Sequence, residues 1–551
     1  MFHAWDSRSQ DIPPSRADLP EKIRTLFVEK QWAAILQLAP ESESYPPDLD
    51  YYRGMAFASL EQWPEAERCF RKGQNKAPSD KRFPLELAGI AFKRGNRSEA
   101  RGLVRRALRL DSDDTYANDF LATLYFLSGN VEAALKYWNR IRKPTLEEVR
   151  SDPHPRVDPV LLDRAFTAAP ASLLRLDDFL RTRDRISSLE IFSPYRLDLT
   201  PRRDGKFDLI FRQHERNGLG AGITERALQM LRGLPYQTLH LEIFNLKRSA
   251  INSRSLVRWD AQKRRAFTSL SGPLAADPKW RFRIHLDGRK EHWDVSRNPG
   301  AVSLPAGEFT LQKLEAGAAL GSMTNRRWEW SSAVEVSHRQ FINPPVPSPL
   351  FTPGLALKYR VQVNRPIFAV PERRVSLTPF AVVETAKIFA RTGNHYSKIQ
   401  GGLDWHWHSR PEGDDYFMTG RFRAGKTLGQ PPFDELFNLG LDRDQEFWFR
   451  GHAGIHDGQK GSGPLGRDYL LVNFELDKEV YSNGIWRLSS GPFFDTGRVY
   501  DRRNIFGYRQ WLYDVGIQAK ARILGVLTLV FVYGKDLRSG GNTFYFDTMN
   551  R

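Results

Sequence analysis

The sequence predicts a chain of three parts: an N-terminal all-α repeat array, a small α+β domain, and a C-terminal transmembrane antiparallel β-barrel. Three observations predict this order. Residues recur every 34 positions in the first part, a strand-helix-helix-strand-strand pattern follows, and apolar and polar residues then alternate to the end. With 551 residues the chain is too long for a single core. The expected divisions are a tail over 1–19, then 20–145, 155–216 and 217–551.

Composition narrows the class of protein before any motif is considered. The 82 Lys and Arg outnumber the 65 Asp and Glu, which gives a net charge of +17. Nucleic acid or anionic lipid would suit such a charge, but arginines scattered over helix faces and inside a polar lumen also explain it, so we expect no nucleic-acid partner. The single cysteine, Cys69, excludes an internal disulfide framework and is expected to be a small core or surface residue of a repeat helix rather than a nucleophile. No run of 18 apolar residues occurs, which excludes a transmembrane helix.

The helical array is predicted from the 34-residue period. Small residues recur at two positions of the unit and larger residues at a third, as expected where paired helices approach closely. These positions are Gly54, Ala88 and Ala122; Ala66, Ala100 and Ala134; and Phe70, Val104 and Trp138. The pattern resembles tetratricopeptide repeats, which implies a concave surface for an extended peptide or a partner protein; a spacer that binds nothing is the alternative. Residues 20–45 are expected to cap the array as a degenerate helix pair.

The middle domain is predicted from short elements between turn signals. The proline-containing segment 144–155 is expected to be a linker. The elements expected after it are an extended run over 157–162, helices over 173–180 and 184–190, and strands over 195–202 and 207–212 joined by the turn at Asp204-Gly205. This order resembles a POTRA domain, which implies a periplasmic module that takes up client strands at a sheet edge. A generic α+β linker domain is the alternative.

The barrel is predicted from strict alternation of apolar and polar residues. Between residues 280 and 287, Trp280, Phe282, Ile284 and Leu286 alternate with Arg281, Arg283, His285 and Asp287. A soluble β-sandwich also alternates. Charge on one face, aromatic residues at segment ends and the lack of any helical interruption favour a membrane barrel. At about 21 residues per strand and connection, the length predicts about 16 strands.

Two groups of residues near the C-terminus carry the functional prediction. The first group is Arg450-Gly451-His452, before a glycine-rich loop and the run from Arg467 to Leu476, and the second is Phe493-x-Asp495-x-Gly497. Together they resemble the superfamily of outer-membrane insertases and two-partner secretion transporters (BamA-, TamA- and FhaC-like proteins). The resemblance implies a loop that folds into the lumen and is tethered there by Arg450 and Asp495. Phe449 and His452 depart from the family pattern at an aliphatic and an aromatic position.

The tether also has a physical reason that is independent of the family. A guanidinium and a carboxylate form a bidentate pair in a partly desolvated site, which suits a loop that must be held inside a barrel. The alternative is that Arg450 and Asp495 are separate lumen-facing charges.

The last strand carries a second resemblance. Ser539, Gly541, Phe544 and Phe546 fit the pattern polar-x-Gly-x-x-aromatic-x-hydrophobic. This resembles the β-signal that assembly machinery reads in outer-membrane barrels. Five residues follow Phe546, which departs from a terminal signal.

Two further patterns are interpreted as parts of strands. Gly420 to Thr427 satisfies the P-loop expression, but the Leu-Gly-Gln-Pro-Pro that follows cannot begin the helix that such a loop requires. Asp404, His406 and His408 share one strand face and could ligate a metal, but lumen lining is favoured. We therefore expect no enzymatic activity, no cofactor and no metal.

The resemblances imply an outer-membrane protein with its N-terminal domains in the periplasm. It would capture unfolded polypeptides and insert them into, or pass them across, the membrane; a dedicated secretion pore and a passive porin with a peptide-binding arm are the alternatives. The expected partners are unfolded outer-membrane or secreted polypeptides, outer-membrane lipid, and periplasmic proteins on the array. The first residues, from Met1 to Ser9, lack the apolar segment of a signal peptide, so no export signal is visible in support of this localisation.

Overall fold

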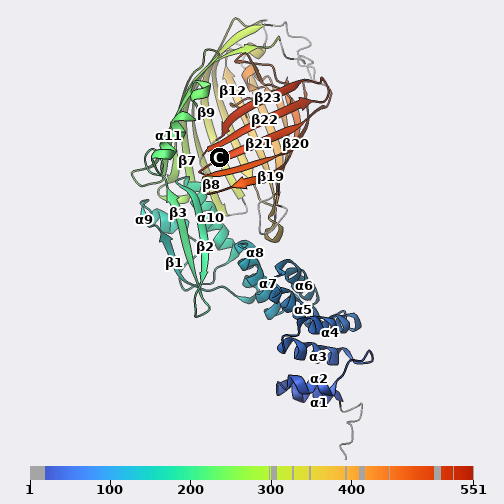
Figure 1. Cartoon of the computed structure of the whole chain (residues 1–551). Helices are drawn as coiled ribbons and strands as arrows, with labels where there is room; N and C mark the ends of the chain where they lie inside the picture. The colour runs from blue at the N-terminus through green and yellow to red at the C-terminus, as the bar shows by residue number, and fades with distance from the viewer. Residues whose placement is uncertain are drawn as a thin grey trace, which may run out of the picture. The chain divides into compact units, whose positions relative to one another are not determined.

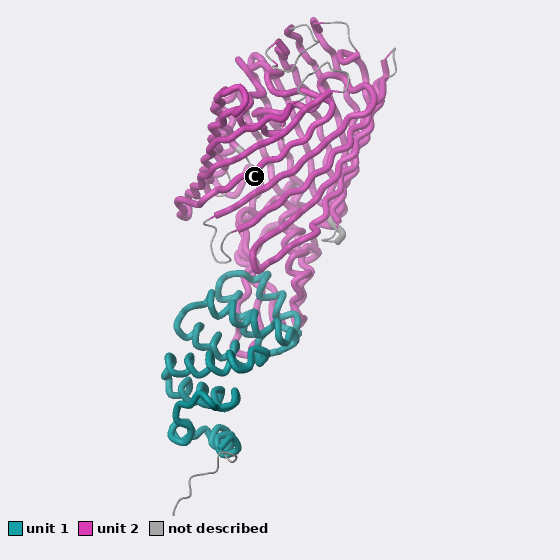
Figure 2. The backbone as a smooth tube through the Cα atoms, turned by 90° about the vertical axis from the view of Figure 1, so that its right-hand side faces the viewer, with its two compact units in different colours: residues 1–143 teal, residues 144–551 magenta. Residues whose placement is uncertain are grey.

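The computed structural model describes residues 19–296, 298, 307–325, 328–345, 349–390, 394–408, 416–445, 447–501, 510–524 and 527–549. The chain divides into two compact units, Met1–Lys143 and Pro144–Arg551 (Figure 2). Over the described ranges, no helix has the length and hydropathy that a membrane span requires.

The first unit is a stack of helices (Figure 1). Their bounds are α1 (Leu19–Val28), α2 (Trp32–Leu38), α3 (Pro47–Ser59), α4 (Trp63–Lys76), α5 (Arg82–Lys93), α6 (Arg97–Leu110), α7 (Thr115–Leu127) and α8 (Val131–Trp138), with the 3₁₀ turn η1 (Asn139–Ile141) at the end. Side chains of Asn96, Asp114 and Asn130 accept backbone N–H groups at the starts of α6, α7 and α8. Such caps satisfy donors that the first turn of a helix leaves free.

The residues that recur every 34 positions lie inside this stack. Gly54 on α3 faces Phe70 on α4, and a Cβ atom at Gly54 would lie 2.5 Å from the ring of Phe70. No larger residue fits there unless the ring moves. The other recurring residues are also buried: Ala66, Ala88, Ala100, Val104, Ala122, Ala134 and Trp138.

The second unit begins with an α/β module, which we define as residues 144–215. Its elements are β1 (Leu146–Asp152), α9 (Pro159–Ala165), α10 (Leu176–Leu189), β2 (Phe192–Pro201) and β3 (Phe207–Glu215). The sheet has the order β1-β3-β2, with β1 parallel and β2 antiparallel to β3.

Three expectations for this module are wrong, although the order strand-helix-helix-strand-strand is the one expected. Residues 144–155 are not a linker, because β1 pairs with β3 along most of its length. Residues 157–162 are not extended, because Asp158 caps α9 by accepting the N–H of Val160 and Pro159 begins the helix. The two helices expected over 173–190 are a single helix, α10.

The rest of the second unit is a curved antiparallel sheet. Its long strands are β4 (Thr238–Leu246), β5 (Ile251–Trp259), β6 (Lys263–Leu274), β7 (Asp277–Asp294), β8 (Glu308–Asn325), β9 (Trp328–Ile342), β10 (Gly354–Asn364), β12 (Val375–Phe389), β13 (His395–His408), β14 (Tyr416–Gly429), β19 (Asp468–Ser482), β20 (Trp486–Tyr500), β21 (Leu512–Ile523), β22 (Leu527–Asp536) and β23 (Asn542–Met549). Short elements lie in the connections: β11 (Phe368–Val370), β15 (Phe437–Asn438), β16 (Ile455–His456), β17 (Gln459–Lys460), β18 (Leu465–Gly466), and the 3₁₀ turns η3 (Pro349–Phe351), η4 (Pro371–Arg373) and η5 (Phe433–Glu435).

The alternation of the sequence places apolar side chains on one face of this sheet. On β7, Ile284 and Leu286 are exposed, whereas Asp287 is buried on the opposite face, where it pairs with Arg265 at 2.8 Å. On β10, Leu355 and Leu357 are exposed in the same way. The sheet therefore has an apolar outer face and a polar, charged lumen, as a barrel in lipid requires.

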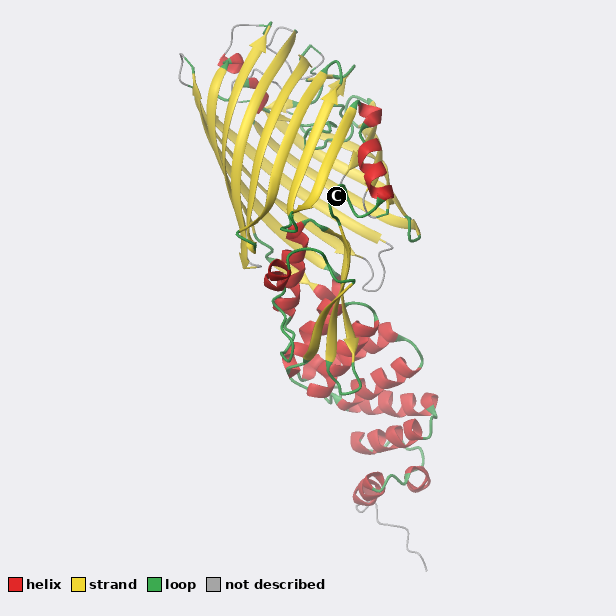
Figure 3. Cartoon of the chain, turned by 90° about the vertical axis from the view of Figure 1, so that its left-hand side faces the viewer, coloured by secondary structure: helices red, strands yellow, loops and turns green. Residues whose placement is uncertain are grey.

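The start of the barrel differs from the expectation. The segment after residue 217 contains the helix α11 (Ile223–Leu231) and the turn η2 (Leu234–Tyr236), and strands begin at Thr238. In the described part of the chain fifteen long strands are present where about 16 are expected, and α11 lies before the first of them, with no described α-helix between β4 and β23. Figure 3 shows a helix against the wall of the barrel, close to the C-terminus.

The two ends of the sheet meet in an unusual way. Consecutive long strands are all antiparallel, so fifteen of them leave β4 and β23 running in the same direction. The strand order brings β23 back to β4. For the described residues, a backbone ladder joins each long strand to the next from β4 to β23, whereas β23 contacts the segment just before β4 through the side chains of Tyr236 and Thr548. We call this junction the seam.

Candidate functional site

The connection between β14 and β19, residues 430–467, folds into the barrel; we call it the lumen loop. Its charged side chains contact inward-facing residues of strands from β5 around to β23. A segment that reaches the inner face of so many strands lies inside the lumen.

The first anchoring point of the lumen loop is acidic. The side chains of Asp434 and Glu435, on η5, are 4 % and 7 % exposed and lie among cations from four strands. Asp434 pairs with Arg339 at 2.8 Å, and Arg339 is only 1 % exposed. The lysines around Glu435 are Lys398 at 3.0 Å, Lys313 at 3.4 Å and Lys358 at 3.8 Å.

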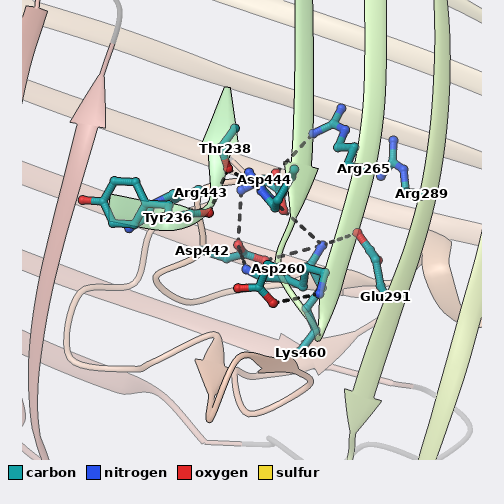
Figure 4. A network of polar contacts seen from close by, with 12 residues as sticks. Tyr236, Thr238, Asp260, Arg265, Arg289, Glu291, Asp442, Arg443, Asp444 and Lys460 are labelled. Atoms are coloured by element: carbon teal, nitrogen blue, oxygen red, sulfur yellow. Dashed lines mark hydrogen bonds and ion pairs between the residues drawn. The ribbon is translucent and has the colours of Figure 1, made fainter. Parts of the chain in front are cut away.

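The second anchoring point is also acidic and faces the strands β5, β6 and β7 (Figure 4). Asp444 pairs with Arg258 on β5 at 2.7 Å and with Arg265 on β6 at 3.2 Å. Asp442 lies 3.6 Å from Lys460, which is itself part of the lumen loop and pairs with Glu291 of β7 at 2.8 Å. This network therefore joins the loop to three consecutive strands.

The third anchoring point brings Arg450 and Asp495 together. The Nη2 and Nε atoms of Arg450 donate to the two carboxylate oxygens of Asp495 at 2.6 and 2.8 Å, and both residues are fully buried. The Nη1 atom of Arg450 donates to Glu475 at 2.9 Å, and its guanidinium lies 3.9 Å from the ring centroid of Phe493. Separating a buried pair of this kind costs about 3–5 kcal/mol because it leaves one charge uncompensated.

The neighbours of Arg450 are held by a second carboxylate. The backbone N–H of Gly451 donates to Asp514, and a Cβ atom at Gly451 would lie 2.4 Å from the carboxyl carbon of Asp514. The ring nitrogens of His452 face Asp514 at 3.1 Å and Asp536 at 3.5 Å. An imidazole therefore occupies the position where the family pattern has an aromatic ring, and it is anchored by carboxylates. Gly497 pairs with Leu471 on β19, where a Cβ atom would lie 2.8 Å from the carbonyl oxygen of Leu470.

A fourth contact ties the lumen loop to the seam. Arg443 pairs with Asp547 of β23 at 3.0 Å and donates to the carbonyl of Phe546 at 3.2 Å. Its guanidinium also stacks on the ring of Tyr236, which precedes β4. The hydroxyl of Tyr236 donates to the carbonyl of Phe546 at 3.3 Å. Arg443 therefore contacts the last strand and the turn just before the first strand at once.

These contacts follow one electrostatic pattern. The acidic side chains of the lumen loop, at 434, 435, 442 and 444, face cations on β5 to β13. The basic side chains, at 443, 450 and 452, face carboxylates on β19 to β23. Lys460, which pairs with Glu291 on β7, is the exception among these basic side chains. The other pairings place acidic and basic residues of the loop against opposite sides of the wall, and this specifies the orientation of the loop inside the barrel.

The sequence indicated Arg450 and Asp495 through a motif, but it did not indicate the acidic anchors. Asp434, Glu435, Asp442 and Asp444 belong to no motif. Their signal was available as six acidic residues, these four with Glu446 and Asp457, within one glycine-rich connection of a strongly basic chain. What they pair with depends on which strand faces point inward, which only the fold supplies.

Two cavities lie beside the lumen loop. One, of about 590 Å³, is lined by residues such as Lys313, Lys358 and Glu435, and the other, of about 710 Å³, by residues such as His240, Arg421 and Glu475. Asp444 and Gln445 line both. The loop therefore separates two charged, polar spaces inside the barrel.

The α/β module contacts the barrel through the end of α10. Glu190 pairs with Arg254 on β5 at 2.6 Å and with Arg281 on β7 at 2.8 Å. Burial raises the pKa of Glu190, but these two guanidinium groups outweigh burial, so the pKa lies below its usual range. The N–H of Asp158 also donates to the carbonyl of Arg248, in the β4–β5 turn, at 2.8 Å.

The remaining sequence motifs lie in or beside strands. Gly420 to Thr427 are in the middle of β14, where neither a phosphate-binding loop nor its helix is formed. Asp404 and His406, on β13, line the cavities of the lumen. Of the residues that resemble a β-signal, Phe544 and Phe546 are on β23, whereas Ser539 and Gly541 are in the turn before it.

Two groups of histidine and carboxylate side chains are close enough to surround a cation, among the described residues: His285, Glu315 and Glu335, and His452, Asp514 and Asp536. In the first group, Glu315 pairs with Lys313 at 3.0 Å and Glu335 with Lys358 at 2.7 Å. In the second, each ring nitrogen of His452 already faces a carboxylate. The neighbouring cations and the divided imidazole do not fit a metal site.

Comparisons with known proteins returned similar structures. No family model matches the chain. No curated protein matches its sequence. Solved structures of similar fold include BamA from Haemophilus ducreyi lacking POTRA domains 1–3 (11% identity, TM-score 0.44, covering 74% of this chain and 84% of that one) and CdiB from Escherichia coli (13% identity, TM-score 0.46, covering 74% and 76%). CdiB from Acinetobacter baumannii is similar over 97% of this chain and 99% of its own, at 10% identity and a TM-score of 0.43.

Proposed function

We propose that this protein is an outer-membrane assembly or translocation factor without enzymatic activity. It takes unfolded polypeptides from the periplasm and inserts them into the outer membrane or passes them across it. The helical array and the α/β module, acting as tetratricopeptide-like and POTRA-like domains in the periplasm, bind the polypeptide first.

The observation that carries this proposal is the seam. The strand order makes β4 and β23 neighbours, but over the described residues no ladder pairs them; the segment just before β4 contacts β23 through side chains such as Tyr236, Arg443 and Thr548. A strand edge without a ladder has backbone donors and acceptors that an incoming strand satisfies by augmentation. A barrel that opens at one junction therefore exposes the strand edges that insertion of a new strand requires. The folding of the client supplies the driving force.

The lumen loop supports the second half of the proposal, passage through the lumen. It separates two cavities and is held by ion pairs, for which the charges of a polypeptide in the lumen would compete. A dedicated secretion pore uses the same loop as its gate. A passive porin keeps the loop in place permanently.

The deciding experiment is depletion of the protein, followed by quantitative mass spectrometry of the outer membrane and the culture supernatant. An insertase predicts loss of several other barrel proteins from the membrane. A dedicated secretion pore predicts loss of a small number of secreted polypeptides with barrels unchanged. If neither fraction changes, the proposal is wrong and the porin remains.

A further inference from the structure

The buried side chains of the helix α11 are polar, and its exposed face is mainly apolar, with the polar Thr224 and Arg226 at the two borders of that face. Glu225, Gln229 and Arg232 (the residue after its end) are buried, whereas Ile223 and Leu231 are 81 % and 57 % exposed. At about 100° per residue, the buried polar positions centre on the side of the helix opposite to the exposed apolar ones. A helix on the surface of a water-soluble domain has the reverse arrangement.

The buried polar face is fully engaged with the barrel and the chain before it. Glu225 pairs with Arg216 at 2.6 Å and accepts the N–H of Ala221 at 2.7 Å. Arg232 donates to Glu242 of β4 at 2.9 Å. The hydroxyl of Thr548, on β23, donates to the carbonyl of Arg232 at 3.2 Å. The end of α11 is therefore bonded to both strands of the seam.

These bonds also show which way the apolar face points. On β4, Leu239 and Leu241 are exposed on the outer face, and His240, between them, lines the lumen cavity. Glu242 shares the face of His240, because side chains alternate along a strand. Since the polar face of α11 points toward Glu242 and the lumen, the face with Ile223 and Leu231 points outward, on the side of Leu239 and Leu241.

We propose that α11 is part of the barrel wall and that its apolar face is covered by the acyl chains of the membrane. The helix stands at the seam, where a sixteenth strand would otherwise close the sheet, since fifteen strands cannot close with an antiparallel pair. Acyl chains are the occupant because the apolar face of α11 continues the exposed apolar face of β4 and β5, which includes Leu239, Leu241, Val257 and Trp259. This inference rests on the proposed function only in requiring that the barrel lies in a membrane.

The test uses nitroxide labels on the full chain in vesicles of phosphatidylethanolamine and phosphatidylglycerol. Cys69 is replaced by Ala, and single cysteines are introduced as Leu231→Cys or Ile223→Cys on α11. Val257→Cys on β5 is the lipid control, and Val160→Cys on the α/β module is the water control; both valines are exposed to a similar degree as Leu231. Collision rates with molecular oxygen, which concentrates in lipid, are compared with those of a water-soluble nickel chelate.

At 231 and 223 we expect the ratio of oxygen to nickel collisions to match that at 257 and to exceed that at 160 several-fold. If collisions with the nickel chelate dominate at 231 and 223 while position 257 gives lipid-like values, the inference is wrong, because α11 then faces water although the barrel lies in the membrane. Low collision rates with both reagents at α11 would mean a protein cover, which also overturns it. Water-like values at 257 as well would instead reject the membrane location and with it the proposed function. A labelled variant is compared only if it retains the far-ultraviolet circular dichroism of the unlabelled chain.

Discussion

Arg443 of the lumen loop pairs with Asp547 of the last strand, with 3.0 Å between Nε and Oδ1. The same guanidinium stacks on Tyr236, just before the first strand. One side chain therefore both holds the lumen loop in place and bridges the seam. Displacing the loop by a polypeptide in the lumen would withdraw this contact from the seam.

Replacing Arg443 should therefore loosen the seam. Arg443→Ala leaves Asp547 buried without this cation, and we expect the free energy of unfolding to fall by about 2 kcal/mol. Urea unfolding of the folded protein in detergent measures the change. Arg538→Ala, in the exposed turn between β22 and β23, is the matched control and should have little effect. Equal stability of both variants would show that Arg443 does not hold the seam.

The pair Arg450–Asp495 should behave as a unit. Arg450→Ala and Asp495→Ala each leave one buried charge without its partner. Each should lower the free energy of unfolding by about 3–5 kcal/mol in the same assay. The double variant removes both charges, so its cost should be well below the sum of the two single costs. Additive costs would mean that the two residues act independently, despite their separation of 2.6 Å.

Gly451 should not tolerate a side chain. The Cβ atom of Gly451→Ala would collide with the carboxylate of Asp514. The segment of the lumen loop around Gly451 must therefore shift and lose its contact with Asp514. We expect a loss of about 1–3 kcal/mol and faster proteolysis within the lumen loop. Gly484→Ala is the control, because no heavy atom lies within 4 Å of its added Cβ atom. Equal rates of cleavage in the two variants would contradict the close packing of Gly451 against Asp514.

The contact between the α/β module and the barrel should weaken in acid. The pKa of Glu190 is lowered in the folded protein, so its carboxylate stabilises the contact above the usual pKa of about 4.3, and this contribution is lost as pH falls through the lower, folded value. Hydrogen exchange of α10 and β2 as a function of pH measures the effect. Glu190→Gln should exchange faster at neutral pH and lack the acid-dependent step. An identical pH profile in both proteins would assign the step to other groups.

Two glycines of the helical array should respond in opposite directions to alanine. Gly54→Ala collides with Phe70 and should lower the thermal midpoint of the fragment 1–143, a compact unit. Gly89, within α5, has open space around its added Cβ atom, so Gly89→Ala should stabilise the helix by about 0.5–1 kcal/mol. Circular dichroism on heating distinguishes them. A destabilised Gly89→Ala would mean that the face bearing Gly89 is covered.

The sequence predicted the strands of the second unit well where a residue pattern repeats along the chain. The prediction failed where a single residue determines whether a segment forms a helix or a strand. Alternation along β7 and β10 placed Ile284 and Leu355 outside, because one residue in two must face lipid. Residues 144–155 were misread because three prolines suggest a linker, although the strand β1 lies between them. The cap at Asp158 turned an expected strand into α9.

The 34-residue period, the alternation after residue 238 and the contact of Arg450 with Asp495 follow from the sequence, because each is a repeated or motif-bound pattern of residue types. The tertiary structure alone decided that the acidic residues 434, 435, 442 and 444 face cations on β5–β13 and that residues 443, 450 and 452 face carboxylates on β19–β23. Those pairings join residues 25 to 186 positions apart in the sequence, from Arg450 and Glu475 to Asp444 and Arg258. It also decided the outward apolar face of α11. A helix shows the same pattern of residues whether water or lipid lies beside it, and only the bond from Arg232 to Glu242 tells which side faces the lumen.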